Sequence, residues 1–218
     1  MNYKAVIFDL DGTLLDTIDD LADSMNAVLK RSSLPVHDTE RYRYFVGTGL
    51  RNLVRKALPE ELRTDDNISK YTNAMAREYE ARWDKKTRPY EGIIDLLYSL
   101  SEIGVRMAVL SNKPHLFTLK VVEKFLPADF FECVFGDREG IPRKPDPVSA
   151  LEISSLMKIP PEHFLYVGDS DTDIKTAVSA GMYPVGVKWG FRDINELIRA
   201  GAKMILEKPR ELLLFFNK

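Results

Sequence analysis

Acidic and polar residues stand directly after short apolar runs in this sequence. The first run, from Ala5 to Phe8, ends in Asp9, and Asp11 and Gly12 follow closely. Later apolar runs end in the same way, and the residues that follow them are Ser111 and Asn112, then Asp137 and Lys144, then Asp169 and Asp173. Together these residues offer several carboxylates, an ammonium group, a hydroxyl group and backbone amides.

Residues of these types suit a metal ion and a phosphate group. Carboxylates that lie close together repel one another, and one of them takes up a proton unless a cation compensates the charge. The sequence has no cluster of thiolates or histidines beside the aspartates, so Mg²⁺ with oxygen ligands is the expected ion. Mg²⁺, a lysine and a serine would attract a phosphoryl group. A carboxylate nucleophile would then split phosphate-ester hydrolysis into two easier displacements.

The apolar runs have the pattern of buried strands in a parallel sheet, because they do not alternate with polar residues. They lie at 5–8, 105–110, 133–135, 164–167 and 184–187, and segments with helical spacing separate them at 91–103, 115–125 and 148–158. This alternation predicts a doubly wound α/β fold with a Rossmann-like parallel sheet. Ligands bind at the carboxyl ends of such strands, so the fold would gather the polar residues at one edge of the sheet.

One stretch interrupts the alternation. Residues 16–87 show helical patterns and no convincing strand, with expected helices at 18–31, 39–45, 50–58 and 68–85 and with Pro35 and Pro59 between them. Four helices after one strand indicate an inserted helical domain. We therefore predict an α/β core of residues 1–15 and 88–218 and a helical cap of residues 16–87. The hinges would lie near 14–16 and 87–90, and we interpret Asp16 as the cap of the first helix.

The composition is that of an ordinary globular protein. Apolar residues make up 44% and charged residues 29% of the chain. The net charge of −2 gives no reason to expect a nucleic-acid or membrane partner. No apolar stretch is long enough to span a bilayer and the N-terminus lacks signal-peptide features, so we expect a cytoplasmic protein. We interpret the single cysteine, Cys133, as a small buried apolar residue.

Four segments resemble, in order, the motifs of the haloacid dehalogenase-like hydrolases. They are DLDGTLLD at 9–16, SNKP at 111–114, KPDP at 144–147 and GDSDTD at 168–173. An Asp-Gly pair alone would indicate only a turn, but four motifs in the family's order are far more specific. The helical insert resembles the cap of one subclass of the family. In the core, segments 143–147 and 187–192 look most like those of phosphoglycolate phosphatases within the family.

This resemblance implies a role for each carboxylate of the motifs. Asp9 would be the nucleophile that forms an aspartyl phosphate, and it would also bind Mg²⁺. Asp11 would protonate the leaving alkoxide and then deprotonate the attacking water, while its backbone carbonyl binds the metal. Asp169 would complete the metal site, with Asp173 as a further metal-site or auxiliary residue.

The remaining motif residues would handle the phosphate. Lys144 would neutralise the charge of Asp9 and of the phosphoryl group. Ser111, the amide of Asn112 and the backbone at Gly12 would hold phosphate oxygens.

Substrate selection would fall to the cap. Residues 45–49, FVGTG, are expected to form a loop whose amides approach the substrate, and a basic cluster of arginines at 41, 43, 51 and 55 could hold a carboxylate. We choose Thr48 and Arg51 as candidate contacts; a solvated helix face is the alternative for each arginine.

The leading substrate from this resemblance is 2-phosphoglycolate or another small phosphorylated acid. The alternatives are a phosphatase for another small metabolite or sugar phosphate, a β-phosphoglucomutase-like phosphomutase, and a non-catalytic binding or regulatory module. The expected partner is a small phosphorylated metabolite, and the protein would be a monomer or a homodimer.

Overall fold

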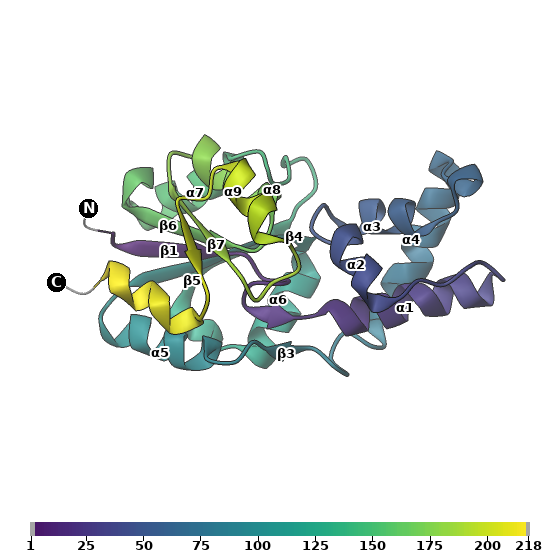
Figure 1. Cartoon of the computed structure of the whole chain (residues 1–218), viewed down its shortest axis with the longest axis horizontal. Helices are drawn as coiled ribbons and strands as arrows, with labels where there is room; N and C mark the ends of the chain where they lie inside the picture. The colour runs from purple at the N-terminus through teal and green to yellow at the C-terminus, as the bar shows by residue number, and fades with distance from the viewer. Residues whose placement is uncertain (1–2, 217–218) are drawn as a thin grey trace.

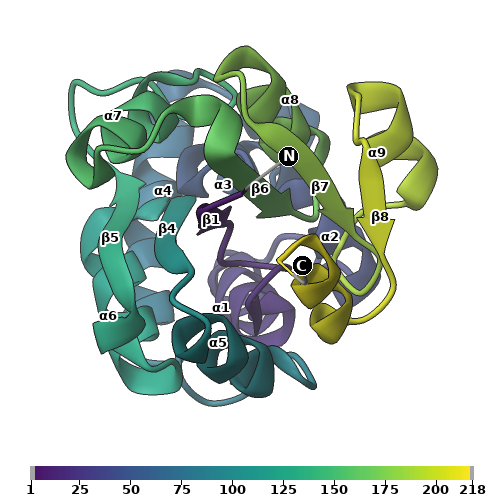
Figure 2. The same ribbon diagram turned by 90° about the vertical axis from the view of Figure 1, so that its left-hand side faces the viewer.

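A six-stranded sheet forms the centre of the larger part of the molecule. The structure is a computed structural model that describes residues 3–216. Its strands follow the order β5-β4-β1-β6-β7-β8, with β1 inside the sheet (Figures 1 and 2). All neighbouring strands are parallel. The strands are β1 (Ala5–Phe8), β4 (Arg106–Pro114), β5 (Phe131–Asp137), β6 (Phe164–Gly168), β7 (Tyr183–Val187) and β8 (Met204–Leu206).

Helices cover both faces of this sheet, which explains why its strands are apolar throughout. Side chains of β1 alternate between two apolar clusters: Phe8 belongs to one and Ile7 to the other. Figure 2 shows α5 on one side of the sheet and α7 and α8 on the other. The predicted doubly wound α/β fold is confirmed. Its helices are α5 (Ile93–Glu102), α6 (His115–Phe125), α7 (Val148–Met157), α8 (Asp171–Ser179) and α9 (Ile194–Ala200).

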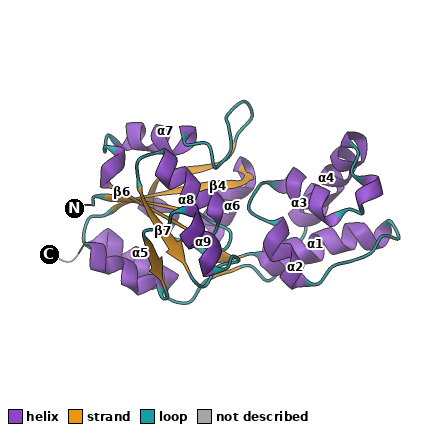
Figure 3. Ribbon diagram, turned by 45° about the horizontal axis from the view of Figure 1, so that its top comes forward, coloured by secondary structure: helices purple, strands orange, loops and turns teal. Residues whose placement is uncertain are grey.

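Four further helices form a cap at one end of the core (Figures 1 and 3). They are α1 (Ile18–Arg31), α2 (Thr39–Phe45), α3 (Leu50–Ala57) and α4 (Asp65–Glu80). These helices share an apolar cluster of their own, in which Met25, Tyr42 and Met75 are fully buried. The predicted helical insert is therefore present.

The two segments that join cap and core run side by side. Strands β2 (Leu15–Asp16) and β3 (Arg88–Pro89) pair in antiparallel fashion, and the side chain of Asp16 forms a 3.1 Å ion pair with Arg88. The N-cap of α1 is Thr17, not Asp16 as we predicted. The predicted boundaries of the cap lie at these strands, and we keep 16–87 as its proposed extent.

Most predicted elements agree with the structure. Helices α1, α2 and α6 have the predicted bounds, whereas α4 begins earlier than predicted, at Asp65, because the side chain of Thr64 caps it. Strand β8 and the short pair β2 and β3 were not predicted. Short 3-10 helices lie at Glu60–Leu62, Ala128–Phe130, Pro161–His163 and Pro209–Phe215. Within residues 3–216, no helix has the length and apolar character to cross a membrane.

Candidate active site

Lys144 lies at the centre of the polar residues that follow the strands. Its ammonium group donates hydrogen bonds to Oδ1 of Asp9 at 2.7 Å and to Oδ1 of Asp173 at 2.6 Å. A third bond of 2.9 Å goes to the backbone carbonyl of Leu110. Burial alone would lower the pKa of Lys144, but the charges of Asp173 and Asp9 raise it well above its usual value. Lys144 is therefore a permanent buried cation.

Three buried carboxylates surround this position. Oxygens of Asp9, Asp169 and Asp173 lie within 4.8 Å of one another, and together they could hold a metal ion. Burial, and next the charge of Asp173, raises the pKa of Asp9 to about 7. Burial and the charge of Asp9 likewise raise the pKa of Asp169 well above its usual value. The single ammonium of Lys144 therefore does not balance this cluster, which favours a further cation.

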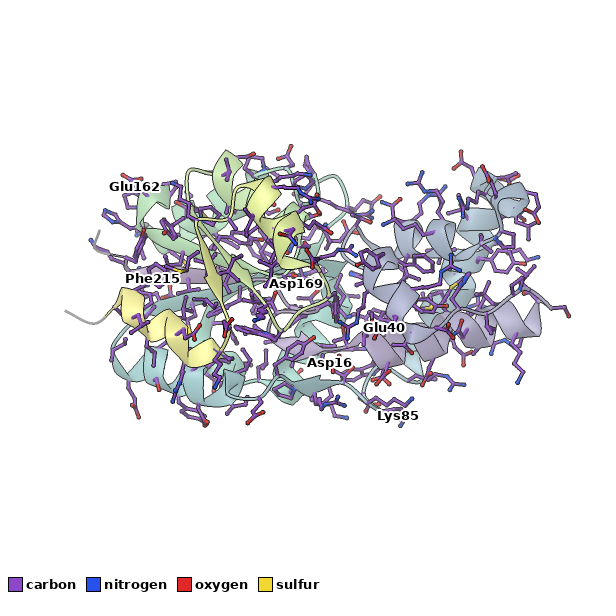
Figure 4. The ribbon with its side chains drawn as sticks, viewed as in Figure 1. Asp16, Glu40, Lys85, Glu162, Asp169 and Phe215 are labelled. Atoms are coloured by element: carbon purple, nitrogen blue, oxygen red, sulfur yellow. The ribbon has the colours of Figure 1, made fainter. Side chains whose placement is uncertain are left out.

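Asp169 is held in a tight backbone pocket. Its Oδ2 accepts a 2.7 Å hydrogen bond from the amide of Phe191. A Cβ atom at Gly12 would lie 2.4 Å from Oδ2 of Asp169, and one at Gly190 would lie 2.2 Å from its Cβ. Figure 4 shows Asp169 on the side of the core that faces the cap. Only glycine at these two positions lets the carboxylate take this place.

Asp173 has both carboxylate oxygens occupied. Oδ1 accepts from Lys144, and Oδ2 accepts from the amide and the hydroxyl of Ser170 at 3.1 and 2.6 Å. These bonds form a capping box at the start of α8. The geometry therefore suits Asp173 to holding Lys144 more than to binding a metal directly.

Asn112 connects three segments of the site. Its side chain exchanges two hydrogen bonds with the backbone of Lys144, at 3.0 and 3.1 Å. It also donates a 3.0 Å bond to the carbonyl of Gly47 in the cap. The neighbouring hydroxyl of Ser111 accepts a 3.1 Å bond from the amide of Lys113, and Ser111 is not the N-cap of α6. The side chain of Arg192 forms a second contact between the core and the cap loop, because it donates a 2.9 Å hydrogen bond to the carbonyl of Val46.

A pocket that is partly open to solvent lies between this cluster and the cap, and its empty space, open solvent included, is about 560 Å³. On the core side it is bounded by motif residues, and on the cap side mainly by apolar side chains. The lining residues are Asp9, Asp11, Leu21, Val46, Gly47, Gly49, Leu50, Leu53, Tyr79, Ser111, Asn112, Lys113, Pro114 and Phe117. Strand ends of the core and three cap segments thus meet at one cavity, as the topology predicted.

Lys113 is a site residue that the sequence analysis missed. Its ammonium group lies 2.9 and 3.2 Å from the two carboxylate oxygens of Asp11. It also lies 4.7 Å from the centre of the Tyr79 ring, which comes from the cap. Its position beside Ser111 and Asn112 in the second motif was the available signal.

The predicted cap contacts are not among the residues that line the pocket. Arg51 instead bonds to Asp65 at 2.7 Å and to Ser69 at 2.8 Å, both on α4. The hydroxyl of Thr48 is buried and has no hydrogen-bond partner among residues 3–216. Gly47 and Gly49, on either side of Thr48, do line the pocket. A substrate role for Thr48 or Arg51 therefore stays a prediction.

Comparison with known proteins identifies the family to which this chain belongs. The family model described as haloacid dehalogenase-like hydrolase matches residues 6–187, so this chain belongs to that family of hydrolases. It is 32% identical to phosphoglycolate phosphatase 1 of Pseudomonas aeruginosa, over 96% of this chain and 78% of that protein. It is 35% identical to a phosphoglycolate phosphatase of Nitrosospira multiformis, over 89% and 88% of the two chains.

Solved structures are similar over the whole chain. A protein from Lactobacillus delbrueckii subsp. bulgaricus superposes with a TM-score of 0.92 at 30% identity, covering 100% of both chains. The crystal structure of a predicted phosphoglycolate phosphatase from Haemophilus somnus gives 0.91 at 26% identity, covering 100% of this chain and 99% of that one. The core and the helical cap are thus both features that this chain shares with these proteins.

Proposed function

We propose that this chain is a magnesium-dependent phosphatase that hydrolyses a small phosphate monoester through an aspartyl phosphate on Asp9. The observation that carries the proposal is the position of the Asp9 carboxylate. It lines the pocket, and its Oδ1 lies 2.7 Å from the ammonium of Lys144. A carboxylate so placed can attack phosphorus while the lysine balances charge on the phosphoryl oxygens.

The remaining groups around the pocket suit the binding of a phosphoryl group. The hydroxyl of Ser111, the amide of Asn112 and the backbone at Gly12 are the groups that we assign to phosphate oxygens. Ser111 and Asn112 line the pocket beside Asp9. Lys144 pairs with the carboxylates of Asp9 and Asp173 and orients Asp9 for its attack on phosphorus. Asp173 acts as the positioning residue of Lys144.

Asp11 is the proposed acid and base. In the first displacement, the Asp9 oxygen bonds to phosphorus, the ester bond breaks and Asp11 gives its proton to the leaving alcohol oxygen. In the second, Asp11 takes a proton from water, the water oxygen bonds to phosphorus and the bond to Asp9 breaks. Cap residues line one side of the pocket, and the cap would limit the access of bulk water while the ester is bound.

The donor set fits Mg²⁺. Asp9 and Asp169 offer carboxylate oxygens and Asp11 offers its backbone carbonyl, which are the oxygen ligands that Mg²⁺ prefers. The raised pKa values of Asp9 and Asp169 are a sign of unbalanced negative charge at the same place. When bound, Mg²⁺ would offset that charge and polarise the phosphoryl group.

The leading substrate is 2-phosphoglycolate, which the names of the two relatives support. The test is phosphate release from a panel of esters with and without Mg²⁺, including 2-phosphoglycolate, ethyl phosphate and several sugar phosphates. We expect release that requires Mg²⁺ and is fastest with 2-phosphoglycolate. Release from no ester in the panel would contradict the proposed function, and fastest release from a sugar phosphate would contradict only the substrate.

A further inference from the structure

The second motif and the cap place two polar groups together in the pocket. Lys113 comes from β4 and Tyr79 from α4, and both line the same cavity as Asp9 and Asp11. The Lys113 side chain is only 3% exposed, and its ammonium group lies 4.7 Å from the Tyr79 ring centre. Core and cap thus each contribute one group to this position.

The O–H of Tyr79 lacks an acceptor. The residue is 3% exposed, and its hydroxyl makes no hydrogen bond of standard geometry to any residue between 3 and 216. Its oxygen interacts with the nearby ammonium of Lys113, which can donate to it but cannot accept its proton. Of the buried polar atoms without a partner in this part of the chain, it is the only one on a residue that lines the pocket. Burial raises the pKa of Tyr79 to about 12, so the hydroxyl keeps its proton and can donate. A buried donor without an acceptor is costly, and a ligand oxygen would satisfy it.

No guanidinium group from the described residues competes for an anionic ligand in this pocket. Arg51 pairs with Asp65 and Arg43 pairs with Glu40. Arg192 donates to the backbone carbonyls of Arg43 in α2 and of Val46 in the cap loop. The pocket's cationic side chain is therefore Lys113, whose only carboxylate neighbour in the described structure is Asp11.

Apart from Tyr79, the side chains on the cap side of the pocket are apolar. Leu21, Leu50 and Leu53 line that side, and Phe117 of the core helix α6 also lines the pocket. None of these four side chains offers a partner for a hydroxyl group. A sugar phosphate would lose the hydration of its hydroxyls against these side chains without compensation. A short acid would need only one polar position, beside Lys113 and Tyr79.

We propose that Lys113 and Tyr79 bind the carboxylate of the substrate, a phosphate ester whose ester carbon carries a carboxylate group. The inference rests on the proposed function, in which Asp11 works at the ester oxygen. The ammonium of Lys113 lies 2.9 Å from the carboxylate of Asp11, and so it is close to the proposed place of the ester oxygen. A substrate carboxylate that is separated from the ester oxygen by one carbon can therefore reach Lys113.

The test compares two esters that differ in the carboxylate, 2-phosphoglycolate and ethyl phosphate, in the wild type and in Tyr79→Phe and Lys113→Met. Tyr71→Phe, a buried tyrosine of the same helix, is the control for Tyr79, and Lys120→Met, on the surface of α6, is the control for Lys113. Circular dichroism checks each fold. If Lys113→Met does not fold, the wild-type comparison and Tyr79→Phe, which removes a single hydroxyl group, still decide the question.

We expect the wild type to prefer 2-phosphoglycolate. Tyr79→Phe should lower kcat/KM for 2-phosphoglycolate about 10-fold, mainly through KM, and leave ethyl phosphate almost unchanged. Lys113→Met should slow both esters, because Asp11 loses its partner, but reduce the preference about 100-fold. Both controls should keep the wild-type preference.

Three results would overturn the inference. They are a wild type without preference, an equal fall on both esters in Tyr79→Phe, and an unchanged preference in Lys113→Met. In each of these the proposed function would survive, because Mg²⁺-dependent release of phosphate would persist. If the wild type released phosphate from neither these esters nor the wider panel, the proposed function would fall and the inference with it.

Discussion

The ammonium group of Lys144 lies 2.7 Å from Oδ1 of Asp9, a residue 135 positions away along the chain. Both side chains are almost fully buried, at 3% and 10% exposure. The same ammonium bonds to Asp173, so one lysine is shared by two carboxylates that are largely shielded from water. This arrangement makes Lys144 important for the fold as well as for the proposed chemistry.

Replacing Lys144 by methionine should therefore damage stability and activity together. Two buried carboxylates lose their cation, which should cost about 3–5 kcal/mol of unfolding free energy, and the rate should fall at least about 100-fold. Urea unfolding and phosphate release measure the two effects. Lys175→Met, which removes an exposed lysine paired with Asp171, should change the unfolding free energy by about 1 kcal/mol or less. Equal effects of the two substitutions would be incompatible with the role of Lys144.

The stability of the metal-free protein should fall as pH rises from 6 to 8. The pKa of Asp9 is raised on folding to about 7, so the folded state holds this proton more tightly than the unfolded state does. That contribution is complete below the unfolded pKa, near 4, and is lost as pH rises through about 7. Between pH 6 and 8 the loss should be about 1 kcal/mol, or about 2–4 °C in Tm.

Adding Mg²⁺ should reverse this loss, because the ion binds the deprotonated carboxylates. The rise in Tm on adding Mg²⁺ should therefore be larger at pH 8 than at pH 6. Thermal melts in a chelator and in Mg²⁺ at both pH values give the comparison, and Asp9→Asn should reduce both effects. A Tm in chelator that stays level or rises from pH 6 to 8 would contradict the prediction.

Gly12→Ala should weaken the metal site through Asp169. The backbone at Gly12 has φ +92°, and its new Cβ would lie 2.4 Å from Oδ2 of Asp169, so the carboxylate must move. The Mg²⁺ concentration for half-maximal rate should rise about 10-fold. Gly140→Ala is the matched control, because Gly140 has φ +76° with no atom near the new Cβ, and it should show backbone strain only. A similar Mg²⁺ requirement in both variants would rule out the contact with Asp169 as the cause.

Asp20 should stabilise the junction between cap and core. Its buried carboxylate, in the first turn of α1, accepts hydrogen bonds from the amides of Lys86 and Thr87 and from the Thr87 hydroxyl, at 2.8–3.0 Å. Asp20→Asn turns one acceptor into a donor that faces other donors, which should cost about 1–3 kcal/mol of unfolding free energy. Asp66→Asn, at an exposed position in the first turn of α4, should cost less than about 1 kcal/mol. The idea fails if urea unfolding gives the two variants equal stability.

The sequence was sufficient for the central strands of the core because they are buried on both faces and end beside polar residues, whereas β8, a partly exposed strand at the edge of the sheet, was missed. The apolar run at Ala5–Phe8 therefore located β1 and, with it, Asp9. Strands β2 and β3 have two residues each, too few to show any periodicity. Asp16 was misinterpreted for the same reason: its partner, Arg88, is close only once these strands pair.

The pocket contacts of the cap depend on which side of a helix faces the core, and this is set by tertiary packing. Arg51 follows the pocket-lining residue Leu50 on α3, but its side chain forms an ion pair with Asp65 on α4. Lys113 follows Asn112 and looks like a surface lysine in the sequence, yet Asp11 and Tyr79 enclose it. The place of Lys113 in the second motif marks it as a candidate, but its contacts, like those of Arg51, depend on segments that are distant along the chain.

The nucleophile Asp9 is the central element of the proposed mechanism. The decisive measurement is phosphate release by purified wild type and Asp9→Asn from the panel of esters in saturating Mg²⁺, with circular dichroism to confirm that both are folded. We predict Mg²⁺-dependent release by the wild type and no release above background by the folded Asp9→Asn protein. Near-normal turnover by Asp9→Asn would contradict the covalent mechanism.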